Sequence, residues 1–224
     1  MDDFHRGLIT QVHCYECNAL YDRIPCPVCG HVIEAEKVRQ PDGSYVERRT
    51  VPGALGWSTH LLLEMMRREW ERADDGPAPM GKTSRKLVIV ILFWTFFESL
   101  MDRFYHAALG DLDEAEAAKI LRKFKFVGGQ LDELHKSLWG MSFWEDLAAL
   151  DYVSLAEQIR TIQERRNAFI HGDPEAIDDT LVARTMGILM DVQFAWIKLF
   201  NTRCTHKRRK IPIRHQVERA AKTR

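Results

Sequence analysis

The stretch that decides how this chain is interpreted is Glu164–Gly172, a run of nine residues with the sequence ERRNAFIHG. It closes a segment of helical character, whose apolar stripe consists of Leu155, Ile159, Ile162 and Phe169. Arg166 falls within this stripe, where a protein core favours leucine. Burying an arginine on an apolar face is costly unless a carboxylate pairs with it or it meets an anion. Both interpretations stay open: a structural ion pair with a neighbouring helix, or an anion-binding site.

Two further polar residues of this run have a defined helical relation to each other. Asn167 and His171 are four residues apart, so a helix places them on one face. Arg166 and His171 are five residues apart, or about 140° around an ideal helix. The arginine and the histidine are therefore not neighbours on a single straight helix.

A cysteine module lies near the N-terminus. Four of the five cysteines form two Cys-x-x-Cys pairs, Cys14 with Cys17 and Cys26 with Cys29, separated by eight residues. Two such pairs supply the tetrahedral sulfur ligands that zinc prefers, and four cysteines leave no open position for catalysis. Gly30, after the second pair, tolerates the left-handed backbone that such a turn needs. The pattern resembles a zinc ribbon with rubredoxin-like knuckles, and we expect one structural zinc ion per chain.

The residues after the cysteines have the alternation of a β-hairpin. Val32–Val38 and Tyr45–Val51 flank the turn signal Pro41-Asp42-Gly43-Ser44. A ribbon with one hairpin is too small for a core of its own, so zinc must help to stabilise it. We therefore assign residues 1–53 to a zinc ribbon with a β-hairpin.

Residues 54–202 are expected to form a helical domain, which makes the fold mainly α. Helical periodicity and end signals predict helices over residues 58–73, 83–108, 113–127, 131–139, 142–149, 154–170 and 174–201. Most of the connections between them are short, which favours an up-and-down helical bundle.

Composition and charge limit the classes of protein to which this chain can belong. The hydrophobic fraction of 46% and the charged fraction of 29% are ordinary for a globular protein. The charged N-terminus shows no signal peptide, and the longest uncharged apolar run, Leu87–Phe97, has 11 residues, too few to span a bilayer. These features predict a cytoplasmic protein without a membrane partner.

The net charge of zero is unevenly distributed. The C-terminal tail, residues 203–224, holds nine basic residues and one acidic residue. Such a tail suits a polyanion, most plausibly nucleic acid, but it could also be a solvated end or bind the acidic body of the chain. We take the residues most suited to contacting a substrate to be Arg165, Lys207, Arg208, Arg209 and Lys210.

The order of the helices and the run Arg166–His171 resemble the HEPN superfamily. Its signature is an arginine, then four to six residues, then a histidine, often with a polar residue directly after the arginine; here the gap is four and the polar residue is Asn167. Many members are metal-independent endoribonucleases of toxin–antitoxin pairs, phage defence or RNA processing. The resemblance covers roughly residues 57–202. It implies an endoribonuclease that cleaves single-stranded RNA, acting as a toxin or a defence effector and with an antitoxin or defence-system protein as a further partner.

The chemistry of such cleavage suits these residues. The 2′-hydroxyl of the RNA is the nucleophile, so the enzyme needs a group that moves a proton near neutral pH and a cation at the phosphate. His171 suits the first role and Arg166 the second, and Asn167 could orient the imidazole or bind the phosphate. No cofactor is expected for catalysis. An acidic partner from an earlier helix is frequent in the superfamily, and Glu98 is the best candidate, although it could simply mark where that helix reaches solvent.

The family resemblance also implies a homodimer, in which two copies of the motif form one composite site. That arrangement would relieve the awkward spacing of Arg166 and His171. A second hypothesis comes from a different class: a catalytically silent bundle that serves as a scaffold, with a zinc ribbon that binds nucleic acid or a partner protein.

Overall fold

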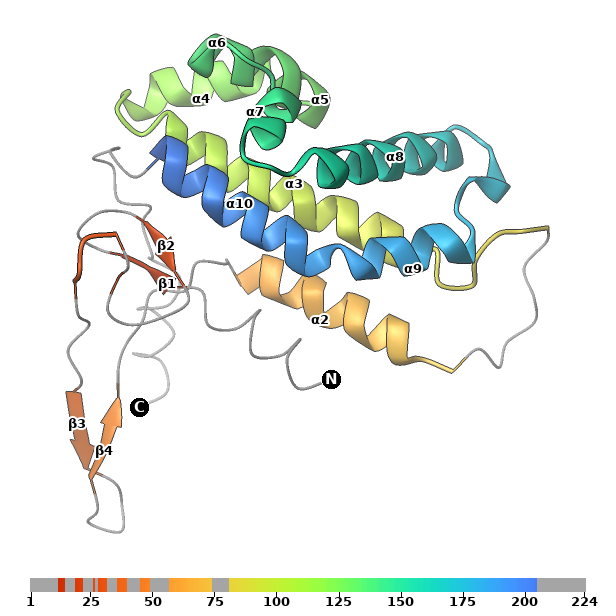
Figure 1. The fold of residues 1–224 in the computed structure, drawn as a ribbon, viewed down its shortest axis with the longest axis horizontal. Helices are drawn as coiled ribbons and strands as arrows, with labels where there is room; N and C mark the ends of the chain where they lie inside the picture. The colour runs from red at the N-terminus through yellow and green to blue at the C-terminus, as the bar shows by residue number, and fades with distance from the viewer. Residues whose placement is uncertain are drawn as a thin grey trace.

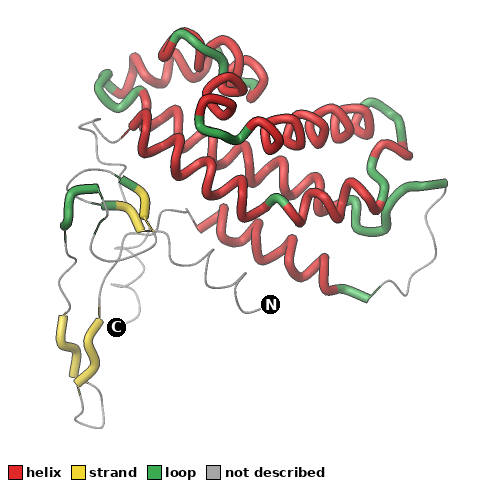
Figure 2. The backbone as a smooth tube through the Cα atoms, viewed as in Figure 1, coloured by secondary structure: helices red, strands yellow, loops and turns green. Residues whose placement is uncertain are grey.

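The computed structural model describes residues 12–14, 19–21, 26, 28–31, 36–39, 45–48, 57–73 and 81–204. Most of these residues are helical (Figures 1 and 2). The mainly helical character predicted from the sequence is thus confirmed for the described part of the chain. Cys17 and residues 205–224, which include the predicted contacts Lys207, Arg208, Arg209 and Lys210, lie outside it.

The helical region contains elements of very different lengths. They are α2 (Trp57–Glu71), α3 (Val88–Ala108), α4 (Glu114–Lys123), α5 (Val127–Gly129), the π-helical turn η1 (Gln130–Leu134), α6 (His135–Trp139), α7 (Phe143–Ala149), α8 (Val153–Ile170), the 3-10 turn η2 (Pro174–Ala176), α9 (Asp179–Gly187) and α10 (Leu189–Cys204).

Helix α3 forms the centre of the helical region. It contacts α2, α8, α9 and α10, and Figure 1 shows it running beside α10 with α2 on one side and α4 to α8 on the other. Its buried residues, among them Phe93, Phe97 and Phe104, form one broad face, whereas Thr95 and Asp102 on the opposite face are exposed. This apolar face packs into the hydrophobic core.

Two helix boundaries differ from the sequence prediction. Helix α3 begins at Val88 rather than at residue 83, because Ser84 donates its backbone N–H to the carbonyl of Ile177 and leads into a turn. The expected single helix over residues 174–201 is wrong: η2 is followed by α9 and α10, which are separated at Ile188. Gly187 weakens the helix there, and Asp178 starts α9 afresh by accepting a hydrogen bond from the N–H of Leu181.

The region between α3 and α8 contains shorter pieces than expected. The helix predicted over residues 113–127 ends at Lys123, and the one predicted over residues 131–139 is divided between η1 and α6. Gly140, at φ 79°, ends α6. Helix α7 begins with a reciprocal capping box between Ser142 and Glu145, so its predicted start is confirmed.

The N-terminal region contains two antiparallel strand pairs. Strand β1 (Val12–His13) pairs with β2 (Leu20–Tyr21), and β3 (Glu36–Arg39) pairs with β4 (Tyr45–Arg48), with Val38 opposite Val46. Strand β2 also contacts α10. The predicted turn over residues 41–44 lies outside the described residues. Among the helices that the structure describes, none combines the length and the apolar character needed to cross a membrane.

Candidate functional site

The Arg–Asn–His run occupies the C-terminal end of α8. His171 is the residue at which the helix stops, and Gly172 follows it at φ +106°, a backbone conformation that side chains with a Cβ rarely adopt. The N–H of Gly172 donates to the carbonyl of Phe169, and the N–H of Asp173 donates to that of Ala168. These two bonds form a Schellman motif, so Gly172 ends the helix and fixes the exit of the chain beside His171.

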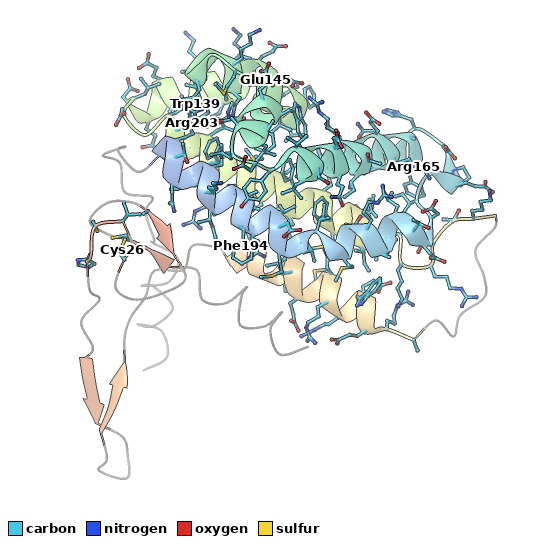
Figure 3. All side chains as sticks on the ribbon, viewed as in Figure 1. Cys26, Trp139, Glu145, Arg165, Phe194 and Arg203 are labelled. Carbon is cyan, nitrogen blue, oxygen red and sulfur yellow. The ribbon has the colours of Figure 1, made fainter. Side chains whose placement is uncertain are left out.

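The loop after the motif is attached to the rest of the helical region at several points. Arg165 donates its Nε–H to the carbonyl of Ala176 at 2.6 Å and lies 3.4 Å from a carboxylate oxygen of Asp178. Thr83 donates its hydroxyl to the carbonyl of Pro174. Arg165, predicted to contact substrate, thus uses part of its exposed side chain to hold the loop that follows the motif. Figure 3 shows Arg165 at this end of α8.

Arg166 is half-buried, and the described residues supply it with no partner of the kind that a structural ion pair needs. Its Nη1 donates to Oδ1 of Asn167 at 3.0 Å, whereas its buried Nε has no hydrogen-bond partner in this part of the chain. Among the described residues, no carboxylate oxygen lies within 4.0 Å of the Arg166 guanidinium. The described structure thus does not support the interpretation of Arg166 as one half of an ion pair between helices. A buried guanidinium donor without a partner is costly, and an anion would satisfy it.

Asn167 and His171 complete this helix end. Asn167 accepts the bond from Arg166 with its side chain, and its backbone carbonyl accepts the N–H of His171 at 2.9 Å. The His171 side chain is exposed. One helix terminus thus presents a guanidinium with spare donors, an amide and an accessible imidazole, the groups needed to bind a phosphate and to move a proton.

Glu98 is not joined to this group. Its carboxylate accepts a hydrogen bond from the indole Nε1 of Trp94, one turn earlier on α3, at 2.8 Å. Within the described part of the chain it bonds neither Arg166 nor His171. The structure therefore assigns Glu98 to the packing of α3 and does not bring it to the predicted catalytic residues.

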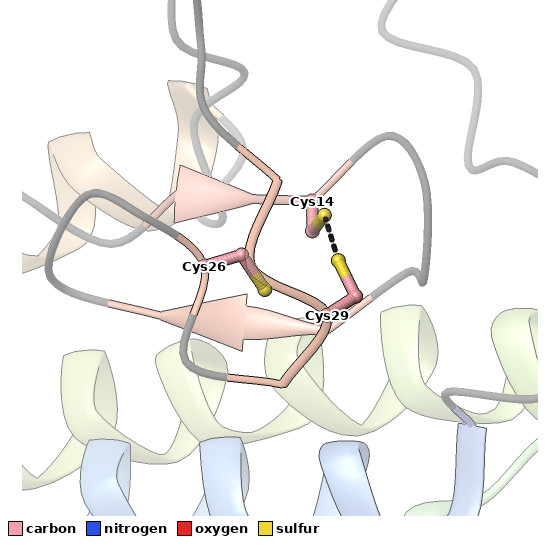
Figure 4. Close-up of side chains that lie close together, drawn as sticks. All are labelled: Cys14, Cys26 and Cys29. Atoms are coloured by element: carbon pink, nitrogen blue, oxygen red, sulfur yellow. Dashed lines mark hydrogen bonds between the residues drawn. The ribbon is translucent and has the colours of Figure 1, made fainter.

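Three of the predicted metal ligands lie together. The Sγ atoms of Cys14, Cys26 and Cys29 all lie within 4.8 Å of one another, and those of Cys14 and Cys29 are 3.6 Å apart (Figure 4). Zinc–sulfur bonds of about 2.3 Å in a tetrahedron place sulfur atoms roughly 3.8 Å apart, so the three thiols fit a metal ion. The structure thus shows a cluster that could hold a metal.

The backbone of the second cysteine pair has the turn that its sequence predicts. Gly30 has φ 75°, and its N–H donates to the carbonyl of Cys26 at 2.9 Å. Cys26 in turn donates its N–H to the carbonyl of His31. Cys14 and Cys26 are almost fully buried, whereas Cys29 is exposed.

A second polar group, which the sequence analysis missed, lies inside the helical region. His135 is fully buried, and its two ring nitrogens face the hydroxyl of Tyr105 at 3.1 Å and a carboxylate oxygen of Asp146 at 2.9 Å. Arg203 holds both oxygens of Asp146, with distances of 2.8 Å to each. We call Tyr105, His135, Asp146 and Arg203 the buried polar network. It joins α3, α6, α7 and α10, and Figure 3 labels Arg203 beside Trp139.

The electrostatics of this network favour a neutral histidine beside an ionised carboxylate. Burial lowers the pKa of His135, although Asp146 opposes that shift. Burial alone would raise the pKa of Asp146, but hydrogen bonds from His135 and Arg203 outweigh it and hold that pKa below its usual value. No sequence pattern predicts the buried polar network, because its members are far apart in the chain and share no helical spacing. Arg203, assigned to the basic tail, belongs instead to α10.

Comparisons of this chain with protein-family models, with curated proteins and with solved structures return no significant match. Its function is therefore inferred from its own residues.

Proposed function

We propose that this chain is a metal-independent endoribonuclease of the HEPN type that cleaves single-stranded RNA by attack of its 2′-hydroxyl. The observation that carries the proposal is the half-buried guanidinium of Arg166, whose Nε has no hydrogen-bond partner among the described residues; it lies next to Asn167 and five residues before the exposed His171. A core arginine without a carboxylate is unexpected in a purely structural helix. A phosphate would supply the missing acceptor, and the histidine stands where the chain leaves the helix.

Each residue has a specific role in this proposal. Arg166 binds the phosphate oxygens and stabilises the charge that develops on them. His171 moves the proton of the 2′-hydroxyl or of the leaving group, because imidazole titrates near neutral pH. Asn167 orients the Arg166 guanidinium through the 3.0 Å bond that they share. Glu98 has no assigned role in this scheme, since its side-chain hydrogen bond among the described residues is to Trp94 rather than to the motif.

Further parts of the proposal concern assembly. The HEPN-like bundle forms a homodimer in which two motifs complete one site, since Arg166 and His171 do not lie side by side on one helix.

Residues 1–53 form a zinc ribbon with a β-hairpin, in which Cys17 is the fourth ligand of a structural zinc ion. The tail contributes Lys207 to Lys210 to RNA binding. The protein acts in the cytoplasm as a toxin or defence effector, restrained by an antitoxin or a defence-system partner.

Cleavage of end-labelled single-stranded RNA in EDTA tests the activity. The wild-type protein should release fragments that end in a 2′,3′-cyclic phosphate, and His171→Ala and Arg166→Ala should each reduce the rate by at least about a hundredfold. His106→Ala is the matched control, because His106 is also exposed on a helix but lies away from the motif. Equal cleavage by His171→Ala and wild-type protein would refute the proposal.

One observation favours a second function. Glu98, the predicted acidic partner of the motif, forms no hydrogen bond with it among the described residues. In this alternative the bundle is a catalytically silent scaffold, and the cysteine module binds nucleic acid or a partner protein. It predicts no cleavage of any RNA by a folded, zinc-loaded dimer and no effect of His171→Ala.

A further inference from the structure

The connection between α4 and α5 presents a cluster of positive charge around one exposed aromatic ring. The residues of this basic–aromatic ledge are Lys119, Arg122, Lys123, Lys125 and Phe126, and all five are exposed. Phe126 has an exposed fraction of 72%, larger than that of any other large hydrophobic side chain in the described part of the chain. Exposing a phenylalanine ring to water brings the fold no stability, so the ring requires another explanation.

The exposure of Phe126 is fixed by its neighbours. Phe124 and Val127, on either side, are partly buried and pack against the hydrophobic core. Phe126 itself has an extended backbone, φ −96° and ψ 137°, where it precedes α5. The chain is thus anchored on both sides of a ring that points away from the core, and little conformational entropy remains to be lost when a flat ligand stacks on it.

The positive charges of the ledge are not neutralised. Among the residues that the structure describes, no carboxylate oxygen lies within 4.0 Å of any of its four cations. By contrast, α2 pairs Arg67, Arg68 and Arg72 with glutamates one turn away. Two of the ledge cations, Lys123 and Lys125, lie 5.0 Å and 4.9 Å from the ring centroids of Phe124 and Phe126.

The helix dipole explains only part of this cluster. Arg122 and Lys123 lie in the last turn of α4, where positive charge stabilises a helix, and Glu114 and Glu116 lie in its first turn. The dipole accounts for neither Lys125 nor Phe126, which lie beyond the end of the helix. Lysines without a carboxylate partner beside an exposed aromatic ring are features by which proteins hold an unpaired strand: cations meet the phosphates and a base stacks on the ring. Lys125 lies over one face of the Phe126 ring, so a base would stack on the other face.

We propose that the basic–aromatic ledge binds single-stranded RNA, with a base stacked on Phe126 and with Lys123 and Lys125 at the adjacent phosphates. The choice of RNA rests on the proposed function, whereas the choice of a single strand rests on the ring, because bases in a duplex are already stacked. Figure 1 shows α4, α5 and α8 on the side of α3 that faces away from α2, so a strand held at the ledge lies on the same side as the motif helix.

Binding of a fluorescent 2′-O-methyl oligouridine, measured by anisotropy with the full-length protein, tests the ledge. This strand cannot be cleaved through its 2′-oxygen, so the result does not depend on nuclease activity. Phe126→Ala should raise Kd about tenfold, since a stacked base contributes about 1–3 kcal/mol. Phe194→Ala is the matched control, as Phe194 is an exposed phenylalanine on α10. A Phe126→Ala Kd within twofold of wild type would overturn the proposal.

Two further measurements sharpen the outcome. The double variant Lys123→Gln, Lys125→Gln should flatten the plot of log K against log salt by about 0.7 for each phosphate that no longer meets a lysine. Binding of a matched duplex as tight as that of the single strand, or of anionic lipid vesicles in place of the strand, would overturn the proposal. Binding at Phe126 without RNA cleavage would refute only the nuclease. Cleavage with an unchanged Kd in Phe126→Ala would refute only the ledge.

Discussion

The carboxylate of Asp146 accepts three hydrogen bonds inside the helical region, although it is buried. The donors are His135 and two nitrogens of Arg203. Asp146→Asn keeps the shape but removes the charge that Arg203 needs, and breaking such a buried pair should cost about 3 kcal/mol of unfolding free energy. Urea denaturation measures this loss. Asp102→Asn, at an exposed ion pair with His106, should change the free energy by less than about 0.5 kcal/mol, and equal effects of the two variants would contradict the central role of Asp146.

Gly172 affects the proposed chemistry through its backbone conformation, because it directly follows His171. Its φ of +106° strains any residue with a Cβ, so Gly172→Ala should destabilise the protein by about 1–2 kcal/mol and displace His171. Gly187→Ala is the matched control, because Gly187 lies in α9, has ordinary φ and has open space around its Cα. That control should be neutral or stabilising. Thermal unfolding measures both variants, and equal stability of Gly172→Ala and wild type would show that the left-handed turn is dispensable.

The buried polar network should make the stability of the helical region depend on pH, because a histidine joins several of its helices. His135 joins α6 to α3 and α7, and its pKa is lowered from the ordinary 6.5 by burial. A histidine held neutral in the folded state contributes stability that is full above the unfolded pKa of 6.5 and is lost as pH falls below it, because the unfolded chain binds the proton more readily. The loss approaches about 1.4 kcal/mol for each pH unit.

The difference between wild type and His135→Gln isolates this contribution. The pKa of the exposed His106 is raised by its bonds to Asp102, so His106 stabilises the fold at lower pH and has the opposite sign. Because both proteins keep His106, its effect cancels in the comparison. Urea denaturation between pH 7 and pH 5 should show a steeper loss of stability in the wild type than in His135→Gln. Parallel curves would contradict the assignment of a neutral buried His135.

The same elements show what the sequence could and could not predict. The apolar run Leu87–Phe97 could be recognised in the sequence, because a long stretch without charge is itself a signal of a buried segment, and it forms the first half of α3. The end of α8 could be predicted because Gly172 is a local signal. The break at Ile188 was not predicted, because a single glycine such as Gly187 is often tolerated inside a helix and so is a weak local signal. The buried polar network escaped because Asp146 and Arg203 meet only through tertiary packing, 57 residues apart.

Arg166 shows the limit of such reasoning at the candidate site. Its position in an apolar stripe could be recognised from spacing, but the sequence left an ion pair and an anion site equally open. The lack of a nearby carboxylate among the described residues counts against the ion pair, and it could not be predicted because it depends on which side chains the neighbouring helices present. Glu98 illustrates the converse: its place after the apolar run suggested a partner for Arg166, whereas a local bond to Trp94 accounts for it.

At the scale of the whole molecule, we expect the cysteine cluster and the helical core to be stabilised separately. Among the described residues, every member of the main hydrophobic cluster belongs to the helical region between Leu63 and Cys204, and the clustered cysteines Cys14, Cys26 and Cys29 take no part in it. Removing the metal should therefore release zinc without unfolding the helices, since the apolar burial that stabilises them is untouched.

Mass spectrometry of purified protein should find about one zinc ion per chain, and Cys26→Ser should lose it because the remaining thiols no longer complete a tetrahedron. Cys204→Ala is the matched control: Cys204 is a buried cysteine on α10, and its loss should leave the zinc content unchanged. Far-ultraviolet circular dichroism of Cys26→Ser should keep its helical signal at wild-type amplitude. A collapse of that signal on zinc loss would show instead that the contact between β2 and α10 couples the two parts into one folding unit, in which the metal stabilises the helices through the N-terminal strands.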